Sequence, residues 1–356
     1  MNKILYFSQV RWDWIKQRPQ FLAEELAEYY DVTVAIQQPL FAKTQKIDGG
    51  VNVKFKKLYR LPFGRFSVIG YINRLMIQLQ LLCVYKKFSI FWISSPLQYP
   101  FASQFLDRKV VVYDCMDDML EFHSNDSLNE QIEKNERSLY KRADYVFCSS
   151  NYLKNKIIGR YGNRDIVVVN NAIKSDISPN TLPIPEEKKQ FFRKGNYNIS
   201  YIGTISEWID KDLMLKVVEH YPNVCFNLFG PLCTTLPVHT NIRHCGVVDH
   251  YHVFSVMEAS DALIMPFVVN ELIRSVNPVK LYEYIYSGKP CLAPCYEESM
   301  PFSDYVLLYH SHEECKEMIR GLLNKTYKQP SKEDCRGFAL NNTWKSRAKV
   351  IAGILG

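Results

Sequence analysis

Apolar runs of strand length alternate with amphipathic helical patterns along most of this 356-residue chain. The N-terminal half predicts strands at residues 3–8, 32–36, 88–94, 110–114, 145–149 and 166–170. The C-terminal half predicts strands at residues 199–203, 225–230, 262–267, 291–293 and 306–309. Such alternation predicts parallel sheets with helices on both faces. The chain is long enough for two domains, so we predict an α/β protein with two doubly wound, Rossmann-like domains facing a cleft.

One segment, residues 175–196, interrupts this alternation. It holds prolines at positions 179, 183 and 185, followed by a charged run. Such a composition is typical of an interdomain linker. We therefore expect a first domain at 1–174, a linker at 175–196, a second domain at 197–340 and a C-terminal helix at 341–356 that crosses back to the first domain.

The net charge of +7 comes from one part of the chain. Residues 49–106 contain no Asp or Glu, and the rest of the chain has 36 basic and 37 acidic side chains. The basic side chains of this acid-free segment are Lys54, Lys56, Lys57, Arg60, Arg65, Arg74, Lys86 and Lys87. Aromatic residues lie between them, and no nucleic-acid recognition module is present. An anionic membrane surface is therefore the favoured partner, with the first six of these side chains facing it. Solvated charge on two ordinary helices is the alternative.

Neither a metal site nor a membrane span is expected from the sequence. The ten cysteines show no spacing that would complete a zinc site, so they are interpreted as buried thiols. Only eleven residues separate Arg74 from Lys86, where a bilayer span needs about 20. The N-terminal apolar run is too short for a signal peptide. These features predict a cytoplasmic protein, peripheral on the inner face of the cell membrane.

The most informative motif is N-P-V-K-L-Y-E-Y at residues 277–284, which is followed by a glycine and a proline at 288 and 290. Pro278 suits the first turn of a helix, whose free N–H groups favour a bound diphosphate. Lys280 is a cation in that first turn, where it is unfavourable unless an anion binds. Glu283 lies on the same helix face and could accept both hydroxyls of a ribose. The alternative is a surface Lys–Glu pair on an ordinary helix.

Further candidate ligand-binding positions follow the predicted strands of the C-terminal half. Glycines there allow a ligand to approach the backbone closely, although each could be a simple turn. The positions at these strand ends are Gly203, Thr204, Gly230, Val248 and Pro266, and the loop before the motif adds Ser275 and Asn277.

This half resembles the donor-binding half of GT-B glycosyltransferases, especially bacterial enzymes of the teichuronic-acid type that build surface polysaccharides. The matching pattern is strand-Pro-Phe, a short loop, N-P-x-K-x-x-E-Y and then S-G-K-P. The resemblance implies that Lys280 binds the diphosphate of a nucleotide sugar, with UDP favoured, and that Glu283 binds the ribose. Many retaining relatives carry E-x7-E, but Ser275 stands at the first position here, and Glu271 is four residues out of register. No metal is expected, because the helix and lysine neutralise the diphosphate.

The first predicted strand is followed by W-x-x-x-R-P-Q at residues 14–20, which looks like the first loop of the same family. The resemblance implies that Asp13, Trp14 and Arg18 lie on the acceptor side. The alternative is that Trp14 packs in the interior and that Arg18 is solvated.

Three carboxylates follow the strand at 110–114, in the pattern Y-D-x-x-D-D. Their crowding should raise at least one pKa, which suits a general base. A similar pattern occurs in family members, and an inverting relative is thought to use an aspartate of this region as its base. We favour Asp117 and place Asp118 second, although Asp118 could instead cap the next helix.

The sequence therefore predicts a metal-independent hexosyltransferase that moves a sugar from a nucleotide donor to a hydroxyl of a lipid-linked glycan. No cofactor and no nucleic-acid partner are expected. Two alternatives are a sugar-nucleotide epimerase of GT-B shape, which needs no acceptor, and a catalytically degenerate scaffold protein.

Overall fold

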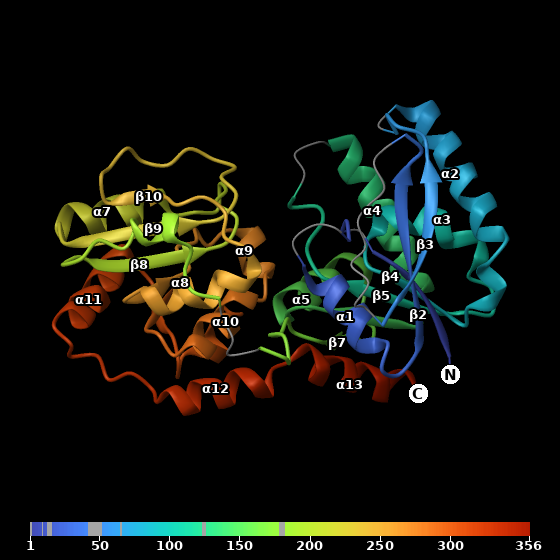
Figure 1. Ribbon diagram of the computed structural model, residues 1–356. Coiled ribbons are helices and arrows are strands. Elements are labelled where there is room, and N and C mark those ends of the chain that lie inside the picture. The colour runs from blue at the N-terminus through green and yellow to red at the C-terminus, as the bar shows by residue number, and fades with distance from the viewer. Residues whose placement is uncertain are drawn as a thin grey trace. The chain divides into compact units, whose positions relative to one another are not determined.

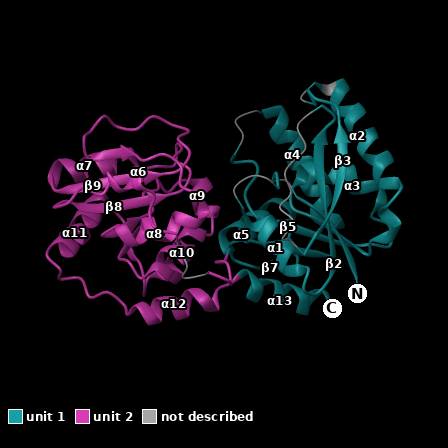
Figure 2. Cartoon of the chain, in the orientation of Figure 1, with its two compact units in different colours: residues 1–171, 344–356 teal, residues 172–343 magenta. Residues whose placement is uncertain are grey.

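Two parallel sheets, each in a compact unit of its own, organise the chain in the computed structural model (Figures 1 and 2). The structure describes residues 2–8, 10–12, 16–41, 52–64, 66–122, 126–177 and 182–356. The first unit comprises residues 1–171 and 344–356, and the second comprises residues 172–343. The predicted α/β class is confirmed.

The first unit has a seven-stranded sheet of order β3-β2-β1-β4-β5-β6-β7, with every neighbouring pair parallel. Its strands are β1 (Lys3–Phe7), β2 (Asp31–Pro39), β3 (Lys54–Arg60), β4 (Ile90–Ile93), β5 (Val110–Cys115), β6 (Tyr145–Cys148) and β7 (Val167–Val168). Its helices are α1 (Arg18–Leu26), α2 (Ser67–Leu82), α3 (Tyr99–Ala102), α4 (Asp126–Arg142), α5 (Asn151–Tyr161) and α13 (Trp344–Leu355), and its 3-10 turns are η1 (Tyr85–Lys87), η2 (Pro96–Gln98) and η3 (Ser103–Phe105).

The core of this first sheet is built on its central strands, which are apolar on both faces. Tyr6 pairs in register with Val34 on one side and Trp92 on the other. The ring of Trp92 stacks between those of Tyr6 and Phe147, at centroid distances of 5.4 and 5.7 Å. Burial on both faces is the reason that these strands form continuous apolar runs in the sequence.

Strand β3 was not predicted from the sequence. It forms the edge of the sheet, and Lys54, Lys56 and Lys57 lie along it opposite residues of β2. Lysines on an edge strand discourage pairing with another chain, so part of the basic segment has a structural reason. The Lys54 ammonium also lies 2.7 Å from the carboxylate of Asp31.

The C-terminal helix α13 belongs to the first unit and packs on α1 (Figure 2). The ring of Trp344 stacks on Phe21 with a centroid distance of 5.5 Å. The Arg347 side chain donates to the carbonyl of Asn170, and the Tyr30 hydroxyl donates to the carbonyl of Ala352. The first unit is therefore made from both ends of the described chain.

The second unit has a six-stranded sheet of order β10-β9-β8-β11-β12-β13, again with parallel neighbours. Its strands are β8 (Tyr197–Ile202), β9 (Val224–Phe229), β10 (Ile242–His244), β11 (Ala262–Ile264), β12 (Cys291–Pro294) and β13 (Leu307–Tyr309). Its helices are α6 (Glu186–Lys189), α7 (Lys211–His220), α8 (Val253–Ala259), α9 (Glu271–Ser275), α10 (Val279–Ser287), α11 (His312–Leu323) and α12 (Lys332–Asn341), and its 3-10 turns are η4 (His250–His252) and η5 (Met300–Phe302).

The described part of segment 175–196 is packed on the second unit rather than free of it. Phe191 and Phe192 contact Phe229, with ring centroids 6.4 and 5.9 Å away. The Lys188 ammonium donates to the carbonyl of Cys245 at 2.7 Å. These contacts make the segment an outer layer of the second unit.

Candidate functional site

Two glycine turns follow the central strands of the second sheet and pack backbone to backbone. Gly203 follows β8 and donates its N–H to the carbonyl of Phe229, at 2.8 Å. Gly230 follows β9, and a Cβ atom there would lie 2.0 Å from the carbonyl oxygen of Gly203. Only glycine can occupy position 230 at this separation. The carboxyl edge of the sheet is therefore held in one fixed arrangement at these two turns.

Lys280 lies against this edge from the first turn of α10. A Cβ atom on Gly203 would lie 2.1 Å from Lys280 Cε, so the lysine stem passes directly over the glycine backbone. The ammonium lies 6.0 Å from the ring centroid of Tyr201. Among the described residues, no carboxylate lies within 4.0 Å of this ammonium. Burial lowers the pKa of Lys280, and the nearby charge of Glu283 opposes that shift.

Glu283 is partly buried three residues further along α10. Burial raises the pKa of its carboxyl, and the charge of Lys280 opposes that shift. The two side chains influence each other without forming an ion pair within 4.0 Å in the described structure. The expected alternative of a surface Lys–Glu pair is therefore absent from this part of the chain. A cation at the positive end of a helix dipole, lacking a close counter-ion, favours a bound anion.

The loop before α10 is buried and internally bonded. Ser275, the last residue of α9, donates its hydroxyl to the carbonyl of Leu272 at 2.7 Å. Asn277 is 3% exposed, and its amide lies 3.5 Å from a carboxylate oxygen of Glu298, which is also buried. Pro278 is the N-cap residue of α10, one position before the first turn in which the sequence predicted it. These contacts fix the position at which α10 begins.

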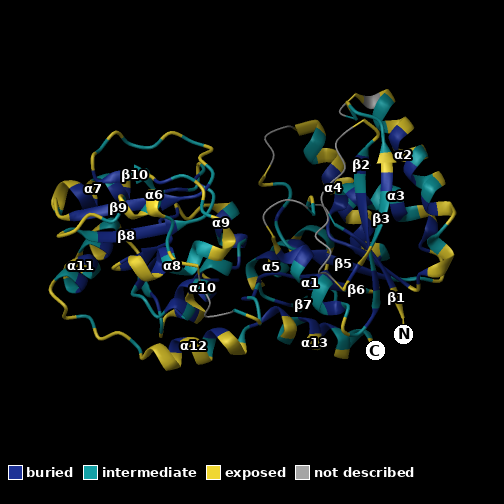
Figure 3. Cartoon of the chain, viewed as in Figure 1, coloured by how far each residue is buried: buried dark blue, intermediate teal, exposed yellow. Residues whose placement is uncertain are grey.

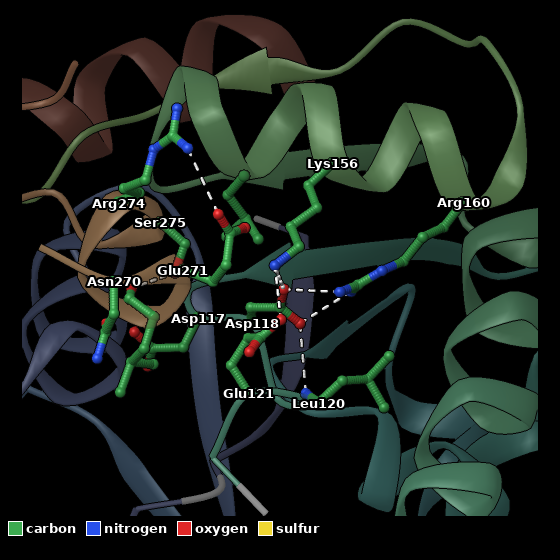
Figure 4. Close-up of polar contacts among 12 residues, drawn as sticks. Asp117, Asp118, Leu120, Glu121, Lys156, Arg160, Asn270, Glu271, Arg274 and Ser275 are labelled. Carbon is green, nitrogen blue, oxygen red and sulfur yellow. Dashed lines mark hydrogen bonds and ion pairs between the residues drawn. The ribbon is translucent and has the colours of Figure 1, made fainter. Parts of the chain in front are cut away.

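Glu271, the out-of-register acid, lies at the start of α9 and is exposed. Its carboxylate pairs with Arg274 (Figure 4). Arg274 also pairs with Glu297. Ser275, drawn in the same view, occupies the first position of the E-x7-E pattern without a carboxylate. Among the remaining predicted positions, the Thr204 carbonyl accepts from Tyr201, the Pro266 carbonyl accepts from the Asp210 N–H, and Val248 packs near Phe229.

In the first unit, Arg18 is buried and paired, which corrects the alternative that it is solvated. Its guanidinium bonds to Asp114 at 2.8 Å and to the Val169 carbonyl at 2.6 Å, and the residue is 4% exposed. Asp13 and Trp14, predicted beside it, lie outside the described residues, and so does Arg65.

Asp118 is fully engaged by two basic side chains of α5 (Figure 4). Arg160 donates to both of its carboxylate oxygens, at 2.8 and 2.7 Å, and the Lys156 ammonium lies 2.9 Å away. Burial alone would raise the pKa of Asp118, but the hydrogen bonds from these two cations outweigh it and lower the pKa. Asp118 does not cap α4, which begins at Asp126; it accepts instead from the N–H of Leu120.

The pKa of Asp117, the preceding residue, is shifted in the opposite direction. Burial raises its pKa to about 6; Arg18 opposes this shift, and the charges of Asp114 and Asp118 reinforce it. Among the described residues, none donates a hydrogen bond to this carboxylate. A carboxylate with a pKa near the working pH and a free oxygen has the properties of a general base.

Asp117 lines a cavity of about 700 Å³ within the first unit. The cavity lies among the segments that follow several strands of the first sheet, where α/β proteins bind ligands. The polar residues that line it with Asp117 are Ser8, Arg11, Gln17, Gln37, Arg60, Ser95 and Gln98. Arg60 and Gln98 were not predicted as ligand-binding residues. Their positions at or after the ends of β3 and β4 are the signal that could have found them.

No family model matches the chain. TuaH of Bacillus subtilis (strain 168), which is named as a glycosyltransferase of teichuronic acid biosynthesis, is 23% identical over 311 residues, covering 78% of this chain and 77% of TuaH. Anabaena HepE, solved with UDP and glucose, has a TM-score of 0.72 at 17% identity over 100% of this chain and 99% of HepE. Sucrose-phosphate synthase from Thermosynechococcus elongatus has a TM-score of 0.69 at 11% identity, over 100% and 98% of the two chains. The chain shares the GT-B fold with these solved structures.

Among the described residues, no group of three or more His, Cys, Asp or Glu side chains is placed to hold a metal ion. The ten cysteines are all free thiols, and most are buried. No helix in the described ranges is both long and apolar enough to cross a membrane.

Proposed function

We propose that this GT-B protein transfers a hexose from a UDP-sugar to a hydroxyl of a lipid-linked glycan, without a metal ion, in bacterial surface-polysaccharide synthesis at the inner face of the cell membrane. The observation that carries the proposal is the position of Lys280, a cation without a close counter-ion at the N-terminus of α10 and against the Gly203 turn. TuaH supports the polysaccharide role by its name, and structures of HepE with UDP and with UDP-glucose support the donor.

The donor half of the reaction uses the second unit. The free N–H groups of α10 and the Lys280 ammonium neutralise the negative charge that develops on the departing diphosphate. Glu283 accepts hydrogen bonds from the ribose hydroxyls. Gly203 and Gly230 keep Lys280 and the two turns in this arrangement at the edge of the sheet, because any side chain there would collide with Lys280 or with the neighbouring turn.

The acceptor half uses the cavity of the first unit. With a pKa of about 6, Asp117 is mostly ionised at pH 7 and can accept the proton of an acceptor hydroxyl. Asp118 remains ionised in its contacts with Arg160 and Lys156, so it holds the backbone of this turn in place rather than exchanging protons.

The proposal is tested by measuring UDP release from UDP-sugars with a lipid-linked glycan extract. Thermal shifts with UDP, GDP, dTDP and CMP first identify the nucleotide, because a ligand stabilises in proportion to RT ln(1 + [L]/Kd). We expect a shift with UDP, and UDP release that depends on the acceptor and is lost in Lys280→Met. Conversion of the donor without UDP release would favour the epimerase, and the absence of any turnover across donors and acceptors would favour the scaffold.

A further inference from the structure

Helix α2 presents an uncharged apolar face to solvent. Its large exposed side chains recur at the spacing of a single helical stripe. They are Val68, Tyr71, Ile72, Leu75, Leu79 and Leu82, called here the α2 face. The opposite side of the helix carries Ile77 and Leu81, which are fully buried in the core of the first unit. Figure 3 shows exposed positions along α2 where a surface helix ordinarily carries charge.

The size of this apolar surface sets it apart from ordinary exposed side chains. Val68 is 70% exposed and Leu79 is 65% exposed, and the helix has one charged residue, Arg74. Single exposed apolar residues are common, but a contiguous stripe marks a surface that binds something. Phe63 and Phe66, 66% and 53% exposed, extend it before the helix.

The charged residues of the chain segment that contains the α2 face are all basic. No acidic residue occurs between positions 49 and 106, and Arg74, Lys86 and Lys87 are exposed on or just after the helix. A helix that lies at the boundary between lipid headgroups and acyl chains typically combines Phe and Leu with Lys and Arg. An anionic lipid headgroup complements the charges of Arg74, Lys86 and Lys87.

We infer that the α2 face docks this protein on an anionic membrane surface, with the helix lying in the plane of the membrane. At 16 residues and about 1.5 Å per residue, α2 is too short to span a bilayer. A second copy of the chain fits the face poorly, because a symmetric pair would bring two acid-free, basic surfaces together. The inference rests on the proposed function, because docking on a membrane would bring the protein to a lipid-linked acceptor.

The inference is tested by flotation with vesicles of phosphatidylcholine, with and without phosphatidylglycerol. We expect binding to the anionic vesicles, which weakens at high salt, and at least a tenfold loss in Leu75→Glu/Leu79→Glu. The matched control is Val238→Glu/Val350→Glu, which adds the same charge at two exposed valines outside the α2 face. Lys86→Gln and Lys87→Gln should each weaken binding about fivefold. Thermal melts and the UDP-induced shift should be unchanged in all of these variants.

Three results would overturn the inference: no binding of the unchanged protein to anionic vesicles, an equal loss in the control variant, or a dimer that Leu75→Glu/Leu79→Glu converts to a monomer without changing vesicle binding. The last result assigns the face to a second copy. The proposed function is tested separately. Vesicle binding without any UDP release would support the docking surface and contradict the transferase activity.

Discussion

The stem of Lys280 lies directly over the backbone of Gly203: a Cβ atom on the glycine would stand 2.1 Å from Lys280 Cε and 2.9 Å from its Nζ. Gly203 in turn lies under Gly230, whose added Cβ would stand 2.0 Å from the Gly203 carbonyl oxygen. The position of the ammonium therefore depends on two glycines that lie far from it in sequence. This dependence gives a test of the donor site that leaves the lysine in place.

Gly203→Ala should displace Lys280 and weaken UDP binding at least tenfold. The new methyl group cannot be accommodated without moving the lysine stem, although the charge and the helix are kept. Isothermal titration with UDP measures the effect. The control is Gly337→Ala in α12 of the same unit, where an added Cβ meets nothing within 4 Å. That change should leave UDP binding intact and stabilise the helix by roughly 0.4–1 kcal/mol.

Lys280→Met should weaken UDP binding about 10- to 100-fold while leaving the ligand-free protein as stable as before, or slightly more so. A charge-assisted hydrogen bond contributes about 1.5–3 kcal/mol. Burial lowers the pKa of Lys280, so the folded protein disfavours its charged form when no anion is bound. Titration with UDP and thermal melts measure the two effects. Lys328→Met, an exposed lysine of the same unit, is the control, and an equal loss of affinity there would argue against the donor role of Lys280.

The sequence was sufficient to predict helix α10 and the sheet strands other than β3 and β10, because these elements depend on local patterns. Continuous apolar runs marked the buried strands, and Pro278 with Gly288 marked the two ends of α10. Strand β3 was missed because an edge strand is fixed by its pairing with β2, and its lysines break the apolar pattern. The roles of the three aspartates also depended on distant partners.

Arg18, Lys156 and Arg160 decide how those aspartates behave, and none of them is adjacent to the Y-D-x-x-D-D motif. Arg18 pairs with Asp114 across 96 positions of sequence, and Arg160 pairs with Asp118 across 42. The sequence could predict that crowding raises one pKa. It could not show which carboxylate would be left without a cation, since that follows from how α1 and α5 pack on the sheet.

Activity should fall as the pH drops through about 6, because the base must be ionised and burial raises the pKa of Asp117 to about 6. Asp117→Asn should remove this dependence together with most of the turnover. The pH profile of kcat/KM measures it. Asp118→Asn is the comparison: it should lower stability by weakening the contacts with Arg160, and it should move the fall in activity towards lower pH, because the charge of Asp118 contributes to the raised pKa of Asp117. An Asp117→Asn variant with unchanged turnover would contradict the assignment.

Asp117→Asn should also stabilise the fold near pH 7. The pKa of Asp117 is higher in the folded protein than in the unfolded chain, so the folded state binds the proton more tightly. Stability therefore rises as the pH falls from about 6 towards about 4, and the ionised carboxylate costs up to about 3 kcal/mol above pH 6. Urea unfolding at pH 5 and pH 8 measures this difference, which should be smaller in Asp117→Asn. A loss of activity accompanied by a gain in stability would separate a functional role from a structural one.

Arg18→Met should destabilise the first unit by about 3–5 kcal/mol, because it leaves the buried carboxylate of Asp114 without its partner. Arg18→Met/Asp114→Asn removes both charges and should recover a large part of that loss. Urea unfolding of the single and double variants gives the coupling energy between the two residues. The donor site lies in the second unit, so UDP binding under native conditions should be the same in both variants. Equal stability of the single and double variants would show that the unpaired carboxylate of Asp114 is not the cause of the loss in Arg18→Met.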